Sequence, residues 1–482
     1  MTHLTTKSLC VIGISFLFLV GGCSAFVVAD QHPTTRPNIV LIYADDQGWR
    51  DIGYNSDGTF KTPVLDKLAQ EGMVFTNAYT NAANCQPARA CLLSGNYTPR
   101  HHVFAVHSTN RGPKNQMRLV PIPNRDGLAE ADVTIADALQ AAGYATGHFG
   151  KWHLYHQGGK KRKGGGGALP SEQGFDVTYD SFGEGELPEG SEGNYKGPGS
   201  DPKGVFELSK QACDFMEAHQ DQPFFVYLAH HAPHSPLNSR KSTRKMIRDP
   251  FQACIYDLDA SVGRVLDKIK DLGLEKETLV IYTSDNGGSA HSQEPLRGAK
   301  GAYYEGGIRE PMIAYWPGVI QAGSTCSTPV MQVDYFPTFL EVAGAAVDKE
   351  LDGESLMPLL KQSGTLKRKS LFWHMPGYLD RPVPRGRDKI FRTRPVSVIR
   401  QGRWKLHLYL EEWVLDGGRE RIADNNCVEL YDLENDIGER TNLAQQHPHI
   451  RDALLADLLA WHDTVQAPIP TKKNPAYVQA GP

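Results

Sequence analysis

Four short apolar runs constrain the fold of this chain most strongly. They are Asn38–Tyr43, Phe224–Leu228, Thr278–Tyr282 and the weaker Tyr144–Phe149. None shows the in–out alternation of a strand with one face in water. An uninterrupted apolar strand is typical of a parallel sheet that is covered on both faces.

Helical patterns alternate with these runs. Thr62 and Pro63 begin one helix as cap and first-turn proline, and Gly72 ends it. Three further segments have helical periodicity: residues 134–142, 205–219 and 251–272. This alternation predicts an α/β fold with a large, mostly parallel central sheet flanked by helices.

The sequence pattern changes after Leu360, where the polar and basic segment KQSGTLKRKS is typical of a linker. Short strand-like runs follow, SVIRQGRWKLHLYL and CVELYDL, and a helix is predicted over residues 449–462. We therefore expect a large α/β domain over residues 36–362 and a smaller C-terminal α+β subdomain with a short antiparallel sheet over residues 370–482. Two glycine-rich segments, residues 160–167 and 182–204, are expected to be surface insertions.

The N-terminal segment reads as an export leader. Lys7 precedes the apolar run LCVIGISFLFLVGG, so residues 1–29 are predicted to be a signal peptide or a lipoprotein leader. LVGGC resembles a bacterial lipoprotein box with a lipid anchor at Cys23, whereas Val27–Ala29 fits ordinary cleavage. Left uncleaved, Leu9–Ala29 is long enough for a membrane anchor. We expect a periplasmic, secreted or lipoprotein-anchored protein.

Net charge and cysteine spacing exclude some classes of protein. A formal net charge of −4 gives no overall attraction to nucleic acid, so no nucleic-acid partner is expected. Outside the leader, the cysteines are Cys85, Cys91, Cys213, Cys254, Cys326 and Cys427. They contain no CxxC pair, which argues against a disulfide scaffold or a zinc ribbon and leaves one or two bridges open.

Polar residues follow each apolar run, where ligands bind in open α/β sheets. In chain order they are Asp45 and Asp46; Lys151 and His153; His230, His231 and His234; and Asp285 and Asn286. Each group alone also fits a turn, a loop cap or a core position. Their occurrence at four strand ends that lie far apart in the sequence predicts one active site.

The oxygen-rich groups indicate a hard metal ion. Asp45, Asp46, Asp285 and Asn286 offer carboxylate and amide oxygens, which suit calcium or magnesium. A zinc site would instead favour histidine and cysteine ligands. A second metal at the sequence HHAPH stays open.

Cys85 is predicted to be a reactive thiol. Pro87 fits the first turn of a helix, so Cys85 would lie at a helix N-terminus, where the macrodipole favours negative charge. Arg89 follows at i+4 and adds a cation. These surroundings predict a lowered thiol pKa. The alternative is a buried structural thiol.

The segment Cys85-Gln86-Pro87-Ala88-Arg89, continued by ACLLSG, resembles the C-x-P-x-R signature of the type I, formylglycine-dependent sulfatases of the alkaline phosphatase superfamily. Other segments are similar to the same family: PNIVLIYADDQGW, GKWHL, HAPHSP, TSDNGG, GRWKLHLY and LRGAKGAYYEGGIREPMIAYWPG. The last of these supplies Lys300. The resemblance covers most of the chain.

The resemblance implies a chemistry for these residues. Cys85 would be oxidised by a formylglycine-generating maturation enzyme to 3-oxoalanine (formylglycine), whose hydrate is the nucleophile. One Ca²⁺ would be held by Asp45, Asp46, Asp285, Asn286 and the modified Cys85. Arg89 would hold the modified residue, and Lys151, Lys300 and His234 would grip the sulfate. Lys300 and His234 would protonate the leaving alcohol, and His153 would take the proton of the remaining hydroxyl, so that sulfate is expelled.

The expected substrate is a sulfate ester on carbohydrate or sulfated polysaccharide. Two alternatives stay open: a phosphodiesterase or phosphatase of the same superfamily, and an inactive protein that binds sulfated glycans. The basic segment Arg381–Pro395 is a candidate contact for a polyanionic chain, or a solvated loop. On the first reading, neutralising Arg385, Arg387 and Arg392 weakens turnover of sulfated polymer.

Overall fold

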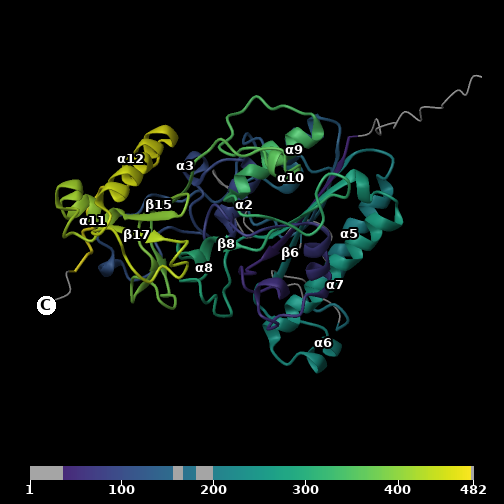
Figure 1. The fold of residues 1–482 in the computed structure, drawn as a ribbon, viewed down its shortest axis with the longest axis horizontal. Helices are drawn as coiled ribbons and strands as arrows, with labels where there is room; N and C mark the ends of the chain where they lie inside the picture. The colour runs from purple at the N-terminus through teal and green to yellow at the C-terminus, as the bar shows by residue number, and fades with distance from the viewer. Residues whose placement is uncertain (1–35, 156–166, 181–198, 479–482) are drawn as a thin grey trace, which may run out of the picture. The chain divides into compact units, whose positions relative to one another are not determined.

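A sheet of eight strands forms the centre of the protein (Figure 1). From one edge to the other its strands are β10 (Ser324–Cys326), β2 (Met73–Phe75), β9 (Ile313–Tyr315), β7 (Thr278–Ser284), β1 (Asn38–Asp45), β6 (Phe224–Pro233), β4 (Ala145–Gly150) and β5 (Val177–Asp180). Only β9 runs antiparallel to its neighbours. The computed structural model describes residues 36–155, 167–180 and 199–478, so the predicted leader and most of the two glycine-rich segments lie outside it.

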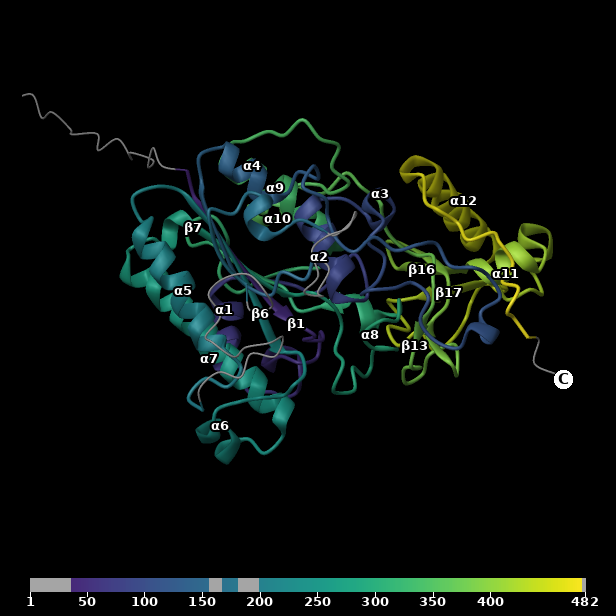
Figure 2. The same cartoon turned by 180° about the vertical axis from the view of Figure 1, so that it is seen from behind.

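Strand β1 shows why the apolar runs lack alternation. Ile39 and Leu41 belong to a core on one face of the sheet, with α4 (Ile135–Ala141), α9 (Tyr335–Ala343) and α10 (Met357–Leu360). Val40 and Ile42 belong to the core on the other face. That core includes α1 (Pro63–Glu71), α5 (Val205–Ala218) and α7 (Pro250–Asp271). Figure 2 shows the two helical layers on either side of β1 and β6. The predicted α/β class is confirmed.

The helix boundaries follow the predicted signals closely. Helix α1 begins at Pro63 after Thr62 and ends at Gly72, and α5 and α7 lie within one residue of the expected ranges. Asp249 caps α7 by accepting the backbone N–H groups of Phe251 and Gln252. Capping satisfies donors that have no partner within the helix.

The C-terminal residues form a four-stranded antiparallel sheet in the order β12 (Ser370–Met375), β15 (Val396–Gln401), β16 (Trp404–Tyr409) and β17 (Val428–Asp432). Helix α12 (Pro448–Val465) buries Leu454, Leu455 and Leu458 in a core shared with this sheet. The same core includes Tyr79 and Ile308 from the earlier part of the chain. The expected smaller antiparallel sheet is confirmed, and the domain boundary near residues 362–370 remains a prediction.

Short elements complete the described structure. Two minor sheets are β11 (Val330–Met331) with β3 (Ala78–Tyr79) and β8 (Arg309–Glu310), and β13 (Leu379–Asp380) with β14 (Phe391–Thr393). The remaining α-helices are α2 (Cys85–Ser94), α3 (Thr98–His101), α6 (Lys241–Met246), α8 (Glu305–Ile308) and α11 (Leu410–Leu415). The 3₁₀ turns are Gly53–Asn55, Lys114–Gln116, Pro170–Glu172, Glu275–Glu277, Gln332–Asp334 and Gly418–Arg421.

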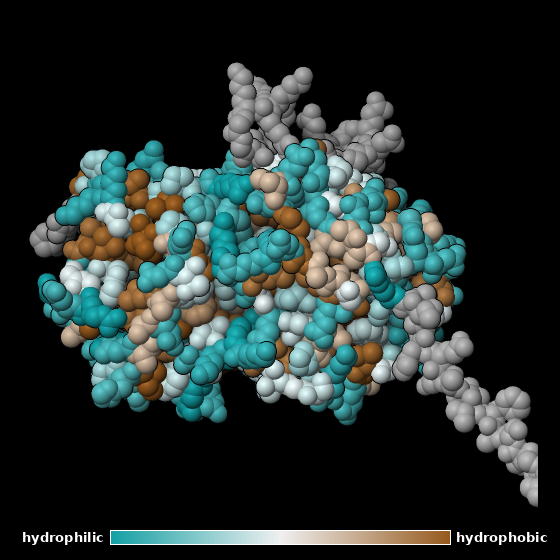
Figure 3. Space-filling view, turned by 90° about the horizontal axis from the view of Figure 1, so that it is seen from above, coloured by the Kyte–Doolittle hydropathy of each residue, from teal (hydrophilic) through white to brown (hydrophobic). Residues whose placement is uncertain are grey.

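The face drawn in Figure 3 mixes hydrophilic side chains with smaller apolar areas. Within the described residues, no helix has the length and apolar character needed to cross a membrane.

The six described cysteines are all free thiols, so the bridges left open by the sequence do not form among them.

Candidate active site

The predicted oxygen ligands lie together at the carboxyl ends of β1 and β7. These strands are parallel neighbours, with Ala44 opposite Ser284, so the residues that follow them meet. The N–H of Asp46 donates to Oδ1 of Asp285 over 3.0 Å. Nδ2 of Asn286 donates to Oδ1 of Asp46 over 2.8 Å. Asp46 adopts a φ of 68°, a left-handed conformation that is uncommon for a residue with a side chain.

Each of the three buried carboxylates has one cation as a partner. The ion pairs are Lys151 Nζ with Asp45 Oδ2 at 2.6 Å, Lys300 Nζ with Asp46 Oδ1 at 2.5 Å, and Arg89 Nη2 with Asp285 Oδ2 at 2.8 Å. The three negative and three positive formal charges cancel. Lys300 Nζ also lies 3.1 Å from Sγ of Cys85, so the lysine joins the carboxylate cluster to the thiol.

The pKa values of two of these carboxylates are shifted in opposite directions, because nearby cations outweigh burial at Asp45 but not at Asp285. Burial raises the pKa of Asp45, but Lys151 and other nearby cations outweigh it and hold that pKa well below its usual range. Burial, followed by the negative charge of Asp45, raises the pKa of Asp285 to about 7 in spite of Arg89. Three desolvated carboxylates in contact are a costly arrangement that additional positive charge relieves.

Cys85 is the first residue of helix α2, as predicted, and all ten residues of the helix are buried. The predicted lowering of its pKa is wrong, because burial raises the pKa of this thiol to about 12. Its side chain is only 2% exposed. Arg89 does not turn to the thiol: its Nη2 pairs with Asp285, and its Nη1 donates to the carbonyl oxygen of Lys151 over 2.8 Å.

The predicted histidines divide into two groups. His234 Nε2 lies 3.8 Å from Asp46 Oδ2, and His231 Nε2 lies 3.8 Å from Asp45 Oδ2. Burial, followed by the charge of Lys151, lowers the pKa of His153 well below its usual range, so this imidazole is neutral. Its Nδ1 has no hydrogen-bond partner among the described residues. His230 is buried, and neither of its ring nitrogens has a partner there either.

Two buried oxygen acceptors mark a place for a cation. Asp45 Oδ1 and Asn286 Oδ1 are buried, and within the described ranges neither has a hydrogen-bond partner. Buried acceptors in native proteins are nearly always paired, so such atoms indicate a bound group. Ligand atoms of Asp45, Asp46, Cys85 and His234 all lie within 4.8 Å of one another. The oxygens of Asp45, Asp46 and Asn286 are ligands that a hard divalent cation prefers.

Sequence reasoning missed Lys203, which supports the histidine loop. Its Nζ donates to the backbone carbonyls of His234 and Pro236. Burial lowers the pKa of Lys203, and Lys151 acts in the same direction. The residue lies in a segment that the sequence indicated to be a surface insertion, and only its basic character in an acidic, glycine-rich stretch sets it apart.

Gln332 is a second missed residue, beneath the carboxylates. Its Nε2 donates to the carbonyl of Ser284 over 2.7 Å and to the carboxyl group of Glu310. Its Oε1 accepts the hydroxyl of Tyr43 over 2.6 Å. The amide therefore links the ends of β1 and β7 to β8. No sequence motif reported this role.

Comparison with known proteins agrees with this geometry. A family model described as Sulfatase matches residues 37–345, and one described as N-sulphoglucosamine sulphohydrolase, C-terminal, matches residues 299–462. Arylsulfatase A of Homo sapiens is 35% identical, over 84% of this chain and 83% of the relative. A protein named Sulfatase from Formosa agariphila is 32% identical, over 90% of this chain and 89% of the relative.

Among solved structures, Ps i-CgsB in complex with k-i-k-neocarrahexaose superposes with a TM-score of 0.69 at 25% identity, over 91% of this chain and 95% of that one. Sequence and structure thus place the fold among hydrolases of the alkaline phosphatase superfamily. The chain belongs to the sulfatase family and is a sulfuric ester hydrolase.

Proposed function

We propose that this sulfatase hydrolyses O-sulfate esters of carbohydrates, using a formylglycine made from Cys85 and one calcium ion. The observation that carries the proposal is the pair of unpartnered oxygens, Asp45 Oδ1 and Asn286 Oδ1, in the carboxylate cluster that Lys300 joins to Cys85. Membership of the sulfatase family and the Cys85–Arg89 signature support the aldehyde.

Asp45, Asp46, Asp285 and Asn286, with an oxygen of the modified residue 85, would hold the calcium ion. When bound, the ion supplies Lewis-acid stabilisation of negative charge on the sulfate oxygens. Arg89 keeps Asp285 oriented through both Nε and Nη2, at 3.2 and 2.8 Å. Both nitrogens donate to the same oxygen, Oδ2, and the guanidinium charge neutralises the carboxylate beside the proposed nucleophile.

Lys151 and Lys300 would grip the sulfate group. In the structure they neutralise Asp45 and Asp46, so both ammonium groups already lie at the carboxylate cluster. Burial opposes the charge of Lys300, but Asp46 outweighs it and raises the lysine pKa, so Lys300 carries a proton. Lys300 therefore has a proton that it could donate to the departing alcohol oxygen. We propose the same role for His234, although burial lowers the pKa of its imidazole.

His153 would act as the base of the second half of the reaction. Because its imidazole is neutral and its Nδ1 has no partner among the described residues, it has a nitrogen lone pair available. A hydrated aldehyde has a second hydroxyl group, whereas serine does not. Removal of that proton by His153 would break the bond to sulfate without attack by water on a stable ester.

The substrate class and cellular location complete the proposal. The solved relative Ps i-CgsB binds a carrahexaose, which supports a saccharide as the substrate here. Oxidation of Cys85 requires a formylglycine-generating maturation enzyme. We also propose export, either with or without a lipid anchor at Cys23, from the apolar N-terminal segment alone.

A mass spectrum of the peptide Tyr79–Arg100 tests the nucleophile. We expect a mass lower than that of the cysteine peptide, since sulfur is replaced by oxygen and two hydrogens are lost. The same preparation should hydrolyse an aryl sulfate and lose activity when calcium is chelated. An unmodified thiol in a fully active preparation contradicts the proposal. Cys85→Ala, which cannot be converted, is the matched inactive control.

A further inference from the structure

Three arginines lie beside the active site, and their guanidinium groups have no part in the steps above. They are Arg111, which belongs to a loop, Arg381, which directly follows β13, and Arg392 of β14. We refer to these three residues as the arginine rim.

A loop connects the catalytic residues to Arg111. At one end, the N–H of His107 donates to Oε1 of Gln86, next to Cys85, over 3.2 Å. The His107 ring lies 6.4 Å from that of His153. At the other end, Nη2 of Arg111 lies 2.8 Å from Oδ1 of Asp380 in β13. The loop therefore runs from the nucleophile to the β13–β14 ribbon.

Arg392 lies directly against the backbone that carries Lys300. Its Nη1 donates to the carbonyl oxygen of Lys300 over 2.9 Å, and its Nε donates to that of Asp380 over 2.8 Å. A Cβ added to Gly301 would lie 2.2 Å from Cδ of Arg392, and Gly301 has a φ of 86°. Glycine at this position lets the arginine approach the catalytic lysine this closely.

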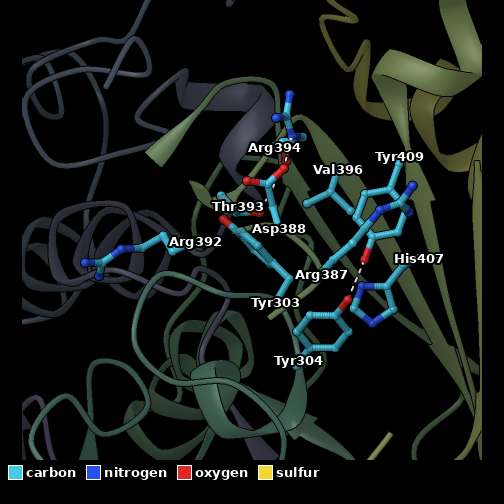
Figure 4. A pocket seen from close by; sticks show the side chains of 10 residues that line it. All are labelled: Tyr303, Tyr304, Arg387, Asp388, Arg392, Thr393, Arg394, Val396, His407 and Tyr409. Carbon is cyan, nitrogen blue, oxygen red and sulfur yellow. Dashed lines mark hydrogen bonds and ion pairs between the residues drawn. The ribbon is translucent and has the colours of Figure 1, made fainter. Parts of the chain in front are cut away.

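The neighbouring arginines of segment 381–395 are used within the fold. Arg385 donates to the carbonyl of Leu296, Arg387 pairs with Glu412 at 2.7 Å, and Arg394 pairs with Glu411 at 2.9 Å. Figure 4 shows Arg392 pointing away from the other side chains of the small pocket that it lines with Arg387 and Arg394. Arg385 and Arg387 each form an ion pair with a glutamate, whereas among the described residues Arg392 contacts backbone carbonyls and forms no ion pair. Of the three arginines of the polymer-contact hypothesis, Arg392 is therefore the one whose charge no carboxylate neutralises.

The rim carries surplus positive charge. Its three guanidinium groups face one carboxylate, Asp380, which contacts Arg111 at 2.8 Å and Arg381 at 3.8 Å. Among the described residues, no carboxylate forms an ion pair with Arg392. Burial and then the charge of Arg111 lower the pKa of Arg392, while the negative charges of Asp380 and, less strongly, Asp46 oppose them.

We propose that the arginine rim binds a second anionic group, a carboxylate or a further sulfate, on the saccharide whose sulfate ester is hydrolysed. This inference rests on the proposed function. Guanidinium groups bind such oxyanions through paired N–H donors. The enzyme thus selects saccharides with at least two anionic groups, one at residue 85 and one at the rim.

Binding measurements on full-length protein with Cys85→Ala separate this inference from catalysis. Calorimetry in calcium buffer compares three disaccharides: a disulfated one, a monosulfated one with a uronate, and a monosulfated neutral one. Charge-assisted hydrogen bonds predict that Arg111→Gln with Arg381→Gln weakens binding of the doubly anionic ligands about 10- to 100-fold. The affinity for the monosulfated neutral disaccharide should change by less than about threefold.

Arg421→Gln is the matched control: this exposed arginine forms an ion pair with Asp424, and its replacement should leave all three affinities unchanged. The single variant Arg381→Gln should keep the fold, because the Arg381 side chain is 82% exposed, and it should weaken binding of the same doubly anionic ligands. Equal losses of affinity for all three ligands, or no loss for any of them, would contradict anion binding by the arginine rim. A loss for only one doubly anionic ligand identifies whether the second group is sulfate or carboxylate. Turnover of an aryl monosulfate by the matured wild-type enzyme tests the proposed function separately.

Discussion

Two buried clusters in this protein both pair carboxylates with cations but differ in their hydrogen bonding. Beneath the C-terminal sheet, Lys405 Nζ lies 2.9 Å from Glu305 Oε1 and 2.9 Å from Glu439 Oε1. Glu305 Oε2 accepts the hydroxyl of Tyr79, and Glu439 Oε2 accepts the N–H of Glu305, each over 2.7 Å. Every carboxylate oxygen of this cluster is therefore paired.

The active-site cluster pairs three carboxylates with three cations, but Asp45 Oδ1 and Asn286 Oδ1 have no partner among the described residues. Burying an unpaired polar atom costs about 1–3 kcal/mol, which a bound cation offsets. The comparison teaches that burial and charge alone do not distinguish a functional site from a structural ion network. These two clusters differ in their unsatisfied acceptors, which only the active-site cluster has among the described residues.

The largest expected effect is loss of stability when the paired cluster is broken. Lys405→Met leaves Glu305 and Glu439 buried without their cation, and we expect the free energy of unfolding to fall by about 3–5 kcal/mol. Denaturant unfolding measures it. Lys67→Met, at an exposed lysine that pairs with Glu71, is the control and should change it by less than about 0.5 kcal/mol. Equal effects for the two variants would show that the buried pair is not structural.

Removal of an unsatisfied acceptor should instead affect catalysis. Asn286→Ala deletes one proposed calcium ligand, and we expect kcat/KM on an aryl sulfate to fall at least about a hundredfold. Its unfolding free energy in calcium-free buffer should change by only about 1 kcal/mol, since one hydrogen bond to Asp46 is lost. Wild-type activity in this variant would remove Asn286 from the site.

Acid should destabilise the C-terminal region through His374. Burial, followed by the charge of His462, lowers its pKa from 6.5 to about 3, so the unfolded chain binds a proton more readily. The stabilisation is complete above pH 6.5 and is lost as the pH falls toward 3. Between pH 7 and pH 5 the loss is about 2 kcal/mol. His374→Asn should reduce the pH dependence of stability by about this amount in denaturant titrations, with the contributions of the other buried histidines unchanged, whereas the exposed His449→Asn should not change it.

Calcium should stabilise only through the unsatisfied cluster. At ten times its Kd, the ion should raise the free energy of unfolding by about 1.4 kcal/mol. We expect Lys405→Met to keep this increment and Asn286→Ala to lose it, as measured by unfolding with and without chelator. The same increment in both variants would place the ion elsewhere.

The strand ends of the active site could be predicted because parallel neighbours deliver their following residues to one edge. Asp45, Lys151, His234 and Asp285 were found in this way. Lys300 follows no strand of the central sheet, so only family resemblance indicated it. Each apolar run marks a strand, and the residues that follow it in the sequence lie at the carboxyl edge of the parallel sheet.

The pKa of Cys85 and the role of Gln332 could not be predicted. Sequence shows a helix N-terminus and a nearby arginine, but it does not show that helix α2 is enclosed on every side. That enclosure reverses the expected direction of the pKa shift. Gln332 joins strands β1 and β7 from more than forty residues beyond β7. Its role depends on the tertiary fold.

The short span from Lys300 to Glu305 joins the two charge clusters. Lys300 contacts Sγ of Cys85, and Glu305 is fixed by Lys405 of β16. A chimera that exchanged the C-terminal part for that of a relative would therefore displace Lys300, the proposed proton donor, unless the donor protein supplied an equivalent buried cation. A segment of this enzyme that is to be exchanged with a relative should therefore end before Lys300.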